Sequence, residues 1–387
     1  MSEKIYLDYA ATTPVDPRVL DVMLPFFAQD FGNPSSVHRY GQKAEAALDE
    51  SRATVAQALN CKPGEIVFTS CGTESNNLAI RGAALVAREQ GGANQILTTR
   101  VEHTAVTRTV EQLKKYYGFQ AKWLDIDETG MVQPETVAAA IDDQTALVTI
   151  MYANNEIGII NPVAEIAVIC REKDIIFHTD ALQATGYFSM NVESLGVDLM
   201  SLGSHKFYGP KGVGALYVRD GVQLISHQTG GKQEKGLRAG TQNIPYIVGF
   251  AEALRLTDLE REVRAAHLKP LRDRIIGTLL EEVPDSQLTG HPISRLPNHA
   301  SFAFKNVDGN TLIQLLDAAG FACSSGSACK TGNPEPSGVM TAIGLAPSWG
   351  LGSLRVTLGA HSTSEQVDSF IAVLPELIAK SRKLHHG

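Results

Sequence analysis

A lysine that follows a predicted strand and precedes a glycine- and proline-containing turn is the first residue of this chain with an evident chemical use. Lys206 lies in the segment SHKFYGPKG (204–212), directly after the predicted strand 198–202. Open α/β sheets place their ligands at the carboxyl edge of the strands. A lysine amine at that edge can form a Schiff base with an aldehyde cofactor. Taken alone, such a lysine is more often a solvated surface charge.

An acidic residue lies at the end of another predicted strand, at the same edge. Asp180 closely follows the run 175–177. A carboxylate there could keep the ring nitrogen of a pyridine cofactor protonated, because the pyridinium is the electron sink. The alternative is that Asp180 caps the next helix. Gln183 could donate to a ring oxygen, or it could be a surface residue of the first helical turn.

A segment of small residues, CGTESNN (71–77), lies between the predicted strand 66–69 and a helical pattern. Gly72 and Thr73 would leave backbone N–H groups free at a helix N-terminus, which is a suitable site for a phosphate group. The alternative is an ordinary helix start with Thr73 as its cap. The sequence leaves both interpretations open, because the same helix N-terminus could bind a phosphate group or be an ordinary helix start.

Three further polar residues follow or occupy predicted strands. His103 follows the strand 95–100 and could stack on an aromatic ring or be a hydrogen-bonded loop histidine. Asn155 follows the apolar run 146–153, so its amide is a candidate ligand contact. Arg355 lies inside a predicted strand, where its planar guanidinium requires a carboxylate partner. That partner could be a substrate or a structural salt bridge.

The segment SSGSAC (324–329) has the composition of an exposed loop and ends on Cys329. A thiol in such a loop is accessible and could act as a nucleophile. Cys170, on the apolar face of a predicted helix, is expected in the core, and Cys323 is expected to be buried. The five cysteines show no paired zinc-site spacing, and their odd number favours a reducing compartment.

Predicted strands and helices alternate through the first two thirds of the chain, which indicates a mostly parallel sheet. After Pro245 a long helix runs to about Glu282, followed by shorter strands and helices. Ser362 and Glu365 have capping-box spacing before the last helix. We predict a large domain over 15–255 and a smaller α+β domain built from 1–14 and 256–387, with a loop at about 321–338.

Composition excludes several classes of protein. Of 387 residues, 43% are hydrophobic and 20% are charged, as in ordinary globular proteins. The net charge of −8 argues against a nucleic-acid binder. No apolar run approaches the roughly 18 residues of a membrane helix. With its charged N-terminus, the protein is expected to be cytoplasmic, without direct contact to membranes or nucleic acid.

Taken together and in order, these segments resemble the cysteine desulfurases of the NifS/IscS type, which are pyridoxal-phosphate enzymes of fold type I in the class V aminotransferase family. The resemblance covers almost the whole chain. It implies a large domain with a mostly parallel seven-stranded sheet. Its motifs are LDYAATTP (7–14), FGNPSS (31–36), CGTESNN, Glu102-His103, NNEIG (154–158), Asp180 with Gln183, SHKFYGPKG, RAGT (238–241), SSGSAC, EPS (335–337) and Arg355.

The resemblance also implies a role for each matching residue. Lys206 would hold pyridoxal 5′-phosphate as a Schiff base, and Asp180, Gln183 and His103 would contact its ring. Asn155 and Arg355 would orient the substrate, with Asn155 also touching the cofactor. The implied phosphate contacts are Gly72, Thr73, Ser204, His205 and, from a neighbouring subunit, Thr241. The family often has a hydroxyl residue where this chain has Gly203, and Ser204 is its nearest replacement.

The implied reaction converts L-cysteine to L-alanine, with Lys206 as general base and acid. The sulfur passes to Cys329 as a persulfide and then to an acceptor, such as an iron–sulfur scaffold or a tRNA-thiolation protein. The family implies a homodimer and no resident metal, although Cys329 could transiently bind an iron–sulfur cluster with a scaffold partner. The alternatives are selenocysteine lyase or another class V reaction, and a non-catalytic sulfur-transfer or assembly subunit.

Overall fold

The computed structural model describes residues 4–325 and 335–385. Its largest element is a seven-stranded sheet, mostly parallel, in the order β2-β8-β7-β6-β5-β3-β4. Only β8 runs antiparallel to its neighbours. The strands are β2 (Ile66–Thr69), β3 (Gln95–Thr99), β4 (Gln120–Leu124), β5 (Thr145–Thr149), β6 (Phe177–Asp180), β7 (Leu199–Gly203) and β8 (Gly214–Val218). This confirms the predicted fold class.

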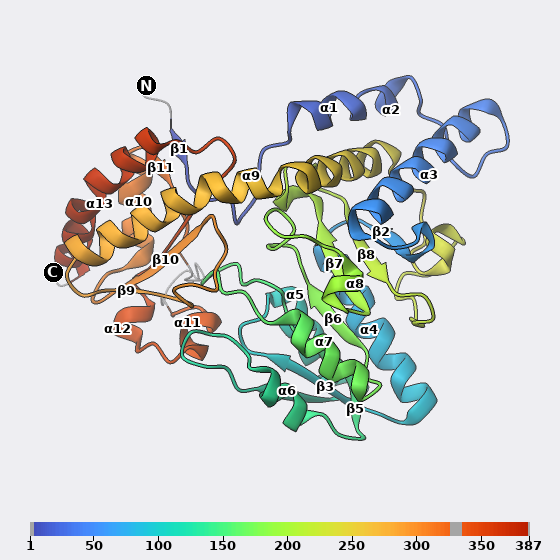
Figure 1. Cartoon of the computed structure of the whole chain (residues 1–387), viewed down its shortest axis with the longest axis horizontal. Coiled ribbons are helices and arrows are strands. Elements are labelled where there is room, and N and C mark those ends of the chain that lie inside the picture. The colour runs from blue at the N-terminus through green and yellow to red at the C-terminus, as the bar shows by residue number, and fades with distance from the viewer. Residues whose placement is uncertain (1–3, 326–334, 386–387) are drawn as a thin grey trace.

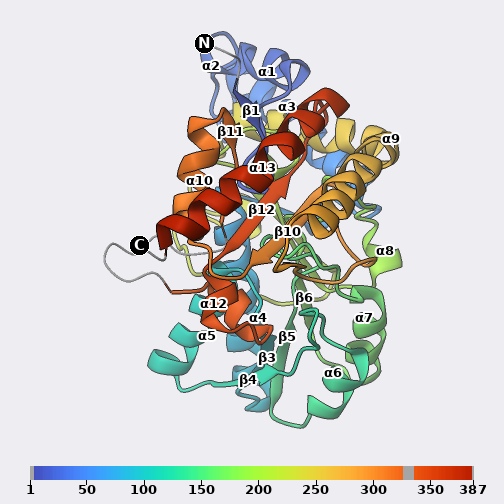
Figure 2. The ribbon, with the colours of Figure 1, turned by 90° about the vertical axis from the view of Figure 1, so that its left-hand side faces the viewer.

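Helices cover both faces of this sheet. In Figure 2, α4 (Gly72–Gly91) and α5 (Thr104–Tyr117) lie on one side, and α6 (Pro134–Ala140), α7 (Val163–Glu172) and α8 (Val192–Leu195) lie on the other. The central strands β5, β7 and β8 are therefore buried along their whole length. Cys170 lies in the core, as predicted. Burial on both faces explains why these strands are continuous apolar runs rather than alternating ones.

A second group of elements lies beside the first (Figure 1). It contains the antiparallel sheet β12-β10-β9 and the parallel pair β1-β11. The long helix α9 (Ile244–Glu282) packs against elements of both groups. The strands are β1 (Ile5–Tyr6), β9 (Ser286–Leu288), β10 (His299–Phe304), β11 (Phe321–Ala322) and β12 (Ser353–Thr357), and the helices are α10 (Gly309–Ala318), α11 (Gly338–Ala342), α12 (Pro347–Gly350) and α13 (Ser364–His385).

The N-terminal region connects the two groups. After β1 the chain crosses from the smaller sheets to α1 (Pro17–Met23), α2 (Pro25–Ala28) and α3 (Arg39–Leu59) (Figure 1). Helices α1 and α3 pack on α9. The segment between β1 and α1 therefore passes the place where the two groups of elements meet.

One predicted helix start is wrong. The last helix is capped by Thr363 and Gln366, not by Ser362 and Glu365. The Thr363 hydroxyl accepts from the Gln366 amide at 3.3 Å, and the Gln366 side chain accepts from the Thr363 amide at 3.2 Å. The Ser362 hydroxyl instead accepts from the Gly359 amide. Because Ser364 is the first helical residue, the cap falls one position later than the spacing alone suggested.

Candidate active site

A cavity of about 150 Å³ opens at the carboxyl edge of the central sheet. Six of its lining residues were singled out from the sequence, and they come from different strands and loops. The cavity is lined by Ala10, Ala11, His103, Met151, Asn155, Asp180, Leu182, Gln183, Lys206 and Arg355. The fold therefore brings together residues that are far apart in the chain, at the edge where open α/β sheets bind ligands.

Lys206 ends the short 3₁₀ turn Ser204–Lys206, which directly follows β7. Its Nζ donates to the carbonyl oxygens of Ala10 at 2.6 Å and Ala11 at 2.8 Å. Burial lowers the pKa of Lys206 to about 8, and the positive charge of Arg355 acts in the same direction. A buried amine with a lowered pKa is readily neutral, and only the neutral amine can act as a nucleophile or base.

Asp180 is the last residue of β6 and is only 4% exposed. Its Oδ2 accepts from Asn76 Nδ2 at 2.7 Å, and its Oδ1 accepts from the Leu182 amide at 3.1 Å. Asn76 comes from α4, and the sequence alone did not identify it as a site residue. These two donors fix the carboxylate at the cavity wall. Asp180 thus makes a local turn contact and also lines the site.

Glu102 is a second buried carboxyl group close to the site, and sequence reasoning gave it no role beyond its place in the motif. Its Oε1 accepts from the Met151 amide at 2.9 Å and the Thr99 hydroxyl at 3.1 Å. Burial raises its pKa to about 8, with the charge of Asp180 adding to that effect. The signal in the sequence was its position directly before His103 at a strand end.

His103 caps the N-terminus of α5. Its Nδ1 accepts from the Ala105 amide at 3.0 Å, which fixes the orientation of the ring. The ring also lines the cavity. The hydrogen-bonded histidine predicted from the sequence is therefore present, and the same residue lines the cavity, where stacking on an aromatic ring stays a prediction.

Gly72 begins α4 and faces the side chain of Leu182, which lines the cavity. The N-cap is Cys71, which makes no side-chain capping bond, so the prediction of Thr73 as the cap is wrong. A Cβ atom on Gly72 would lie 2.3 Å from the Leu182 side chain, which explains the glycine. The uncapped amides of a helix N-terminus can accept an anion such as a phosphate.

His205 and Ser204 behave differently, although they are neighbours. The His205 ring hydrogen-bonds the Thr12 hydroxyl at 3.2 Å, and burial lowers its pKa to about 4. Ser204 is fully buried, and its Oγ points to Gly209, where an added Cβ would lie only 1.9 Å away. The structure thus does not bring the Ser204 hydroxyl to the cavity, because successive residues of the 3₁₀ turn face different sides.

Arg355 and Asn155 both line the cavity and are hydrogen-bonded to each other. Arg355 Nη1 donates to the Asn155 carbonyl oxygen at 2.9 Å, and Nη2 donates to Asp8 Oδ1 at 2.7 Å. Gln183 Nε2 donates to the Ala10 carbonyl at 2.9 Å. The predicted structural salt bridge of Arg355 therefore exists, and the same residue also faces the cavity.

Five predicted site residues that the structure describes do not line this cavity: Gly72, Thr73, Ser204, His205 and Thr241. Cys329 lies outside the described residues. Thr241 is exposed and lies three residues after Arg238. Its implied role requires a second subunit.

The residues present fit pyridoxal 5′-phosphate. The buried Asp180 carboxylate is held by two donors and could meet a ring nitrogen. The Lys206 amine lines the same cavity, and the Gly72 end of α4 offers free amides for a phosphate. Within 4–325 and 335–385 no group of three or more His, Cys, Asp or Glu side chains could hold a metal ion. No helix in those ranges is long and apolar enough to cross a membrane.

Comparison with known proteins places the chain in a family. Residues 5–370 match the family described as aminotransferase class-V. The chain is 43% identical over 386 residues to "Cysteine desulfurase IscS" of Clostridium botulinum, covering 99% of this chain and 96% of that relative. A solved "NifS-like protein" superimposes with a TM-score of 0.90 at 36% identity, covering 97% of this chain and 100% of the other. "SspA in complex with cysteine" gives 0.80 at 34% identity, covering 93% and 100%.

The chain therefore belongs to the aminotransferase class-V family and, within it, to the cysteine desulfurases of the NifS/IscS type. Pyridoxal 5′-phosphate is the cofactor of this group. The recognised resemblance, the enzyme class and the cofactor expected from the sequence are thereby confirmed.

Proposed function

We propose that this desulfurase takes sulfur from L-cysteine, leaves L-alanine, and carries the sulfur as a persulfide on Cys329. The single observation that best supports this is the meeting of Lys206, Asp180 and Arg355 around one small cavity. The relatives are named cysteine desulfurases, and a structural neighbour carries cysteine in its title.

Each residue has a defined task in this proposal. The bound cofactor supplies an electron-withdrawing ring. Asp180 would hold a proton at the ring nitrogen, and His103 would pack against the ring. Arg355 and Asn155 orient the substrate carboxylate. Lys206 Nζ, as a neutral amine, moves the proton at the substrate Cα.

Sulfur transfer is the task of Cys329. Its thiolate attacks the substrate sulfur, so that a sulfur–sulfur bond forms while the carbon–sulfur bond breaks and its electron pair stays with the carbon. Protonation of that carbon then gives alanine. A thiolate is required because the protonated thiol is a poor nucleophile.

The cofactor contacts and the assembly are further parts of the proposal. Gly72, Thr73 and His205 would hold the phosphate, and Gln183 would donate to the ring hydroxyl. Thr241, exposed at the surface of this chain, would complete the phosphate site of a second copy in a homodimer. We also propose the division into a large domain (15–255) and a small domain (1–14 and 256–387).

The acceptor of the sulfur is proposed by class only. An iron–sulfur scaffold is favoured by the "IscS" names of the relatives, and a tRNA-thiolation protein is the alternative. The location proposed is the cytoplasm, where free thiols persist. The competing functions are selenocysteine lyase or another class V reaction, and a non-catalytic assembly subunit.

The experiment is a visible spectrum of the purified protein before and after L-cysteine, with alanine and sulfide measured under a reductant. We expect a cofactor band that changes with cysteine, and both products. Cys329→Ala should lose sulfide formation, whereas Cys61→Ala, a half-buried thiol away from the cavity, should not. Unchanged turnover by Cys329→Ala would refute the persulfide step and favour a lyase. A protein that binds no cofactor would favour the assembly subunit.

A further inference from the structure

The segment that follows β1 is built into the site, although it contains no residue that the sequence marked as catalytic. The Leu7 amide donates to the Ala322 carbonyl at 2.9 Å, and the Leu7 carbonyl accepts from the Thr357 amide at 2.8 Å. Leu7 is thus held between β11 and β12. The same segment supplies the two carbonyl groups that hold Lys206 Nζ. Its place in the sheet positions the next side chain, Asp8, beside Arg355.

Two of the three guanidinium nitrogens of Arg355 make hydrogen bonds within the described residues, and the third does not. Its Nη2 donates to Asp8 and its Nη1 to the Asn155 carbonyl, whereas its buried Nε has no hydrogen-bond partner within the described residues. Arg355 is only 9% exposed. A guanidinium group has five N–H donors in a rigid fork. Donors are therefore left over for a further acceptor at the cavity wall.

We propose that Asp8 is a positioning residue that holds Arg355 so that its remaining N–H donors face the carboxylate of the amino-acid substrate. Among the described residues, Asp8 is the only carboxylate that forms an ion pair with Arg355. The proposal rests on the proposed function, because it assigns Arg355 to the substrate. Asp8 itself does not touch the substrate in this arrangement, and it acts through the orientation of the guanidinium.

Asp8 also has an electrostatic effect on Lys206. The charges that act on this amine are Arg355 from β12, which lowers its pKa, and Asp180 from β6 and Asp8 from the N-terminal segment, which raise it. Replacing Asp8 by a neutral residue leaves the positive charge of Arg355 uncompensated. The pKa of the Lys206 nitrogen should then fall. A purely structural role for Asp8 would not produce this shift.

The experiment compares Asp8→Ala and Asp8→Asn in the cofactor-loaded protein. Three quantities are measured: the KM and kcat for L-cysteine, the Kd for L-alanine from the change in the visible band, and the pH midpoint of that band. Asp8→Ala should raise KM and Kd about tenfold with kcat within about twofold, since orientation is lost but the reacting groups remain. Asp8→Asn should raise them about threefold, because its amide oxygen can still accept from Nη2. Both should move the midpoint to lower pH.

Asp317→Asn is the matched control, because Asp317 forms an exposed ion pair with Lys4 in the same region, at 2.8 Å. It should change none of the three quantities. The proposal is overturned if Asp8→Ala leaves the Kd unchanged, or if it tightens binding, which would mean that Asp8 competes with the substrate. An unmoved midpoint would overturn the electrostatic part. If the unsubstituted protein makes no alanine, the proposed function fails, while the Kd and the midpoint still decide the role of Asp8.

Discussion

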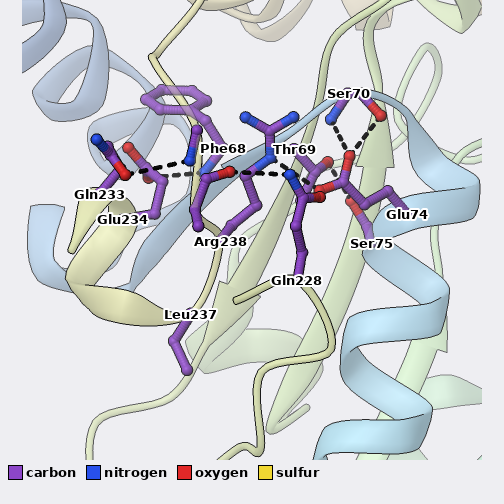
Figure 3. Close-up of polar contacts among 12 residues, drawn as sticks. Phe68, Thr69, Ser70, Glu74, Ser75, Gln228, Gln233, Glu234, Leu237 and Arg238 are labelled. Carbon is purple, nitrogen blue, oxygen red and sulfur yellow. Dashed lines mark hydrogen bonds and ion pairs between the residues drawn. The ribbon is translucent and has the colours of Figure 1, made fainter. Parts of the chain in front are cut away.

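Two regions of this molecule bury charged side chains, and they satisfy those charges to different degrees. Around the cavity, Lys206 is held by two carbonyl groups, and the buried Nε of Arg355 has no hydrogen-bond partner among the residues that the structure describes. In the second region, a segment near residues 233–242 is tied to α3 and α4 by ion pairs and to β2 by a backbone amide. Figure 3 shows the contacts to β2 and α4. The contrast separates groups kept for chemistry from groups that hold the chain in place.

The second region centres on Glu234, which is only 5% exposed. Its two oxygens accept from Arg52 at 2.7 and 2.8 Å, and one also accepts from the Phe68 amide at 2.9 Å. A few residues away, Arg238 Nε donates to Glu74 at 2.9 Å (Figure 3). Glu234 and Lys235 adopt left-handed backbone angles, which are unfavourable for residues other than glycine. The ion pairs offset that cost.

The difference in charge compensation between the two regions has a physical explanation. A buried carboxylate whose hydrogen bonds outweigh the cost of burial stays ionised, as the lowered pKa of Glu74 shows, and removing one partner of such a pair is destabilising. A buried charge with incomplete compensation has a shifted pKa, as Lys206 and Glu102 show. Shifted pKa values are a property of sites that transfer protons. Variants in the first region should therefore cost activity, and variants in the second should cost stability.

The largest expected effect is that of Lys206→Ala. Loss of the amine removes both the attachment of the cofactor and the proton transfer at Cα, so alanine formation should fall by about 10³-fold or more. The midpoint of denaturant unfolding should stay unchanged or rise, since a buried cation without a carboxylate partner is lost. Lys211→Ala, an exposed lysine of the same loop, should retain full turnover. Normal alanine formation by Lys206→Ala would show that the assignment is wrong.

The next largest effect is expected for Glu234→Ala, which should lower stability and leave activity nearly unchanged. Arg52 and the Phe68 amide would lose a buried partner, which should lower the free energy of unfolding by about 3 kcal/mol. The kcat of the fraction that remains folded should stay within about twofold. The control is Asp220→Asn, which breaks an exposed pair with Lys62 and should cause no measurable change. A stable but inactive Glu234→Ala would contradict the division between the two regions.

The sequence predicted the positions of residues at strand ends better than it predicted their partners. Lys206, Asp180 and His103 were placed at the sheet edge because strand length and order determine where each strand stops. Asn76 and Asp8 were missed as partners because their contacts are distant in sequence. Asn76 bonds to Asp180, which is 104 positions away, and Asp8 bonds to Arg355, which is 347 positions away. Such pairings depend on the packing of separate elements and leave no periodic pattern. The sequence did not reveal the direction of the Ser204 hydroxyl for a local reason, since the turn directs this hydroxyl to Gly209.

The smallest expected effect concerns the pH dependence of stability, and it compares one carboxyl group from each region. The folded-state pKa of Glu102 is raised to about 8 by burial. Between pH 4.5 and 8, the unfolded chain releases this proton while the folded chain keeps it, so Glu102 lowers the free energy of unfolding as the pH rises. In Glu74 the hydrogen bonds from Arg238 and Ser70 outweigh burial and lower the pKa. Its contribution is present above pH 4.5 and is lost only as the pH falls.

Glu102→Gln and Glu74→Gln should therefore differ in how strongly their effect on the free energy of unfolding changes with pH. Relative to the unsubstituted protein, Glu102→Gln should gain at least about 1 kcal/mol of unfolding free energy between pH 5 and pH 8. Glu74→Gln should be destabilised by a nearly constant amount across that range, because its carboxylate is ionised throughout. Denaturant unfolding at several pH values measures both slopes. If the unfolding free energy of Glu102→Gln differs from that of the unsubstituted protein by the same amount at every pH, Glu102 ionises normally in the folded protein. The cavity region would then compensate its charges as fully as the Glu234 region does.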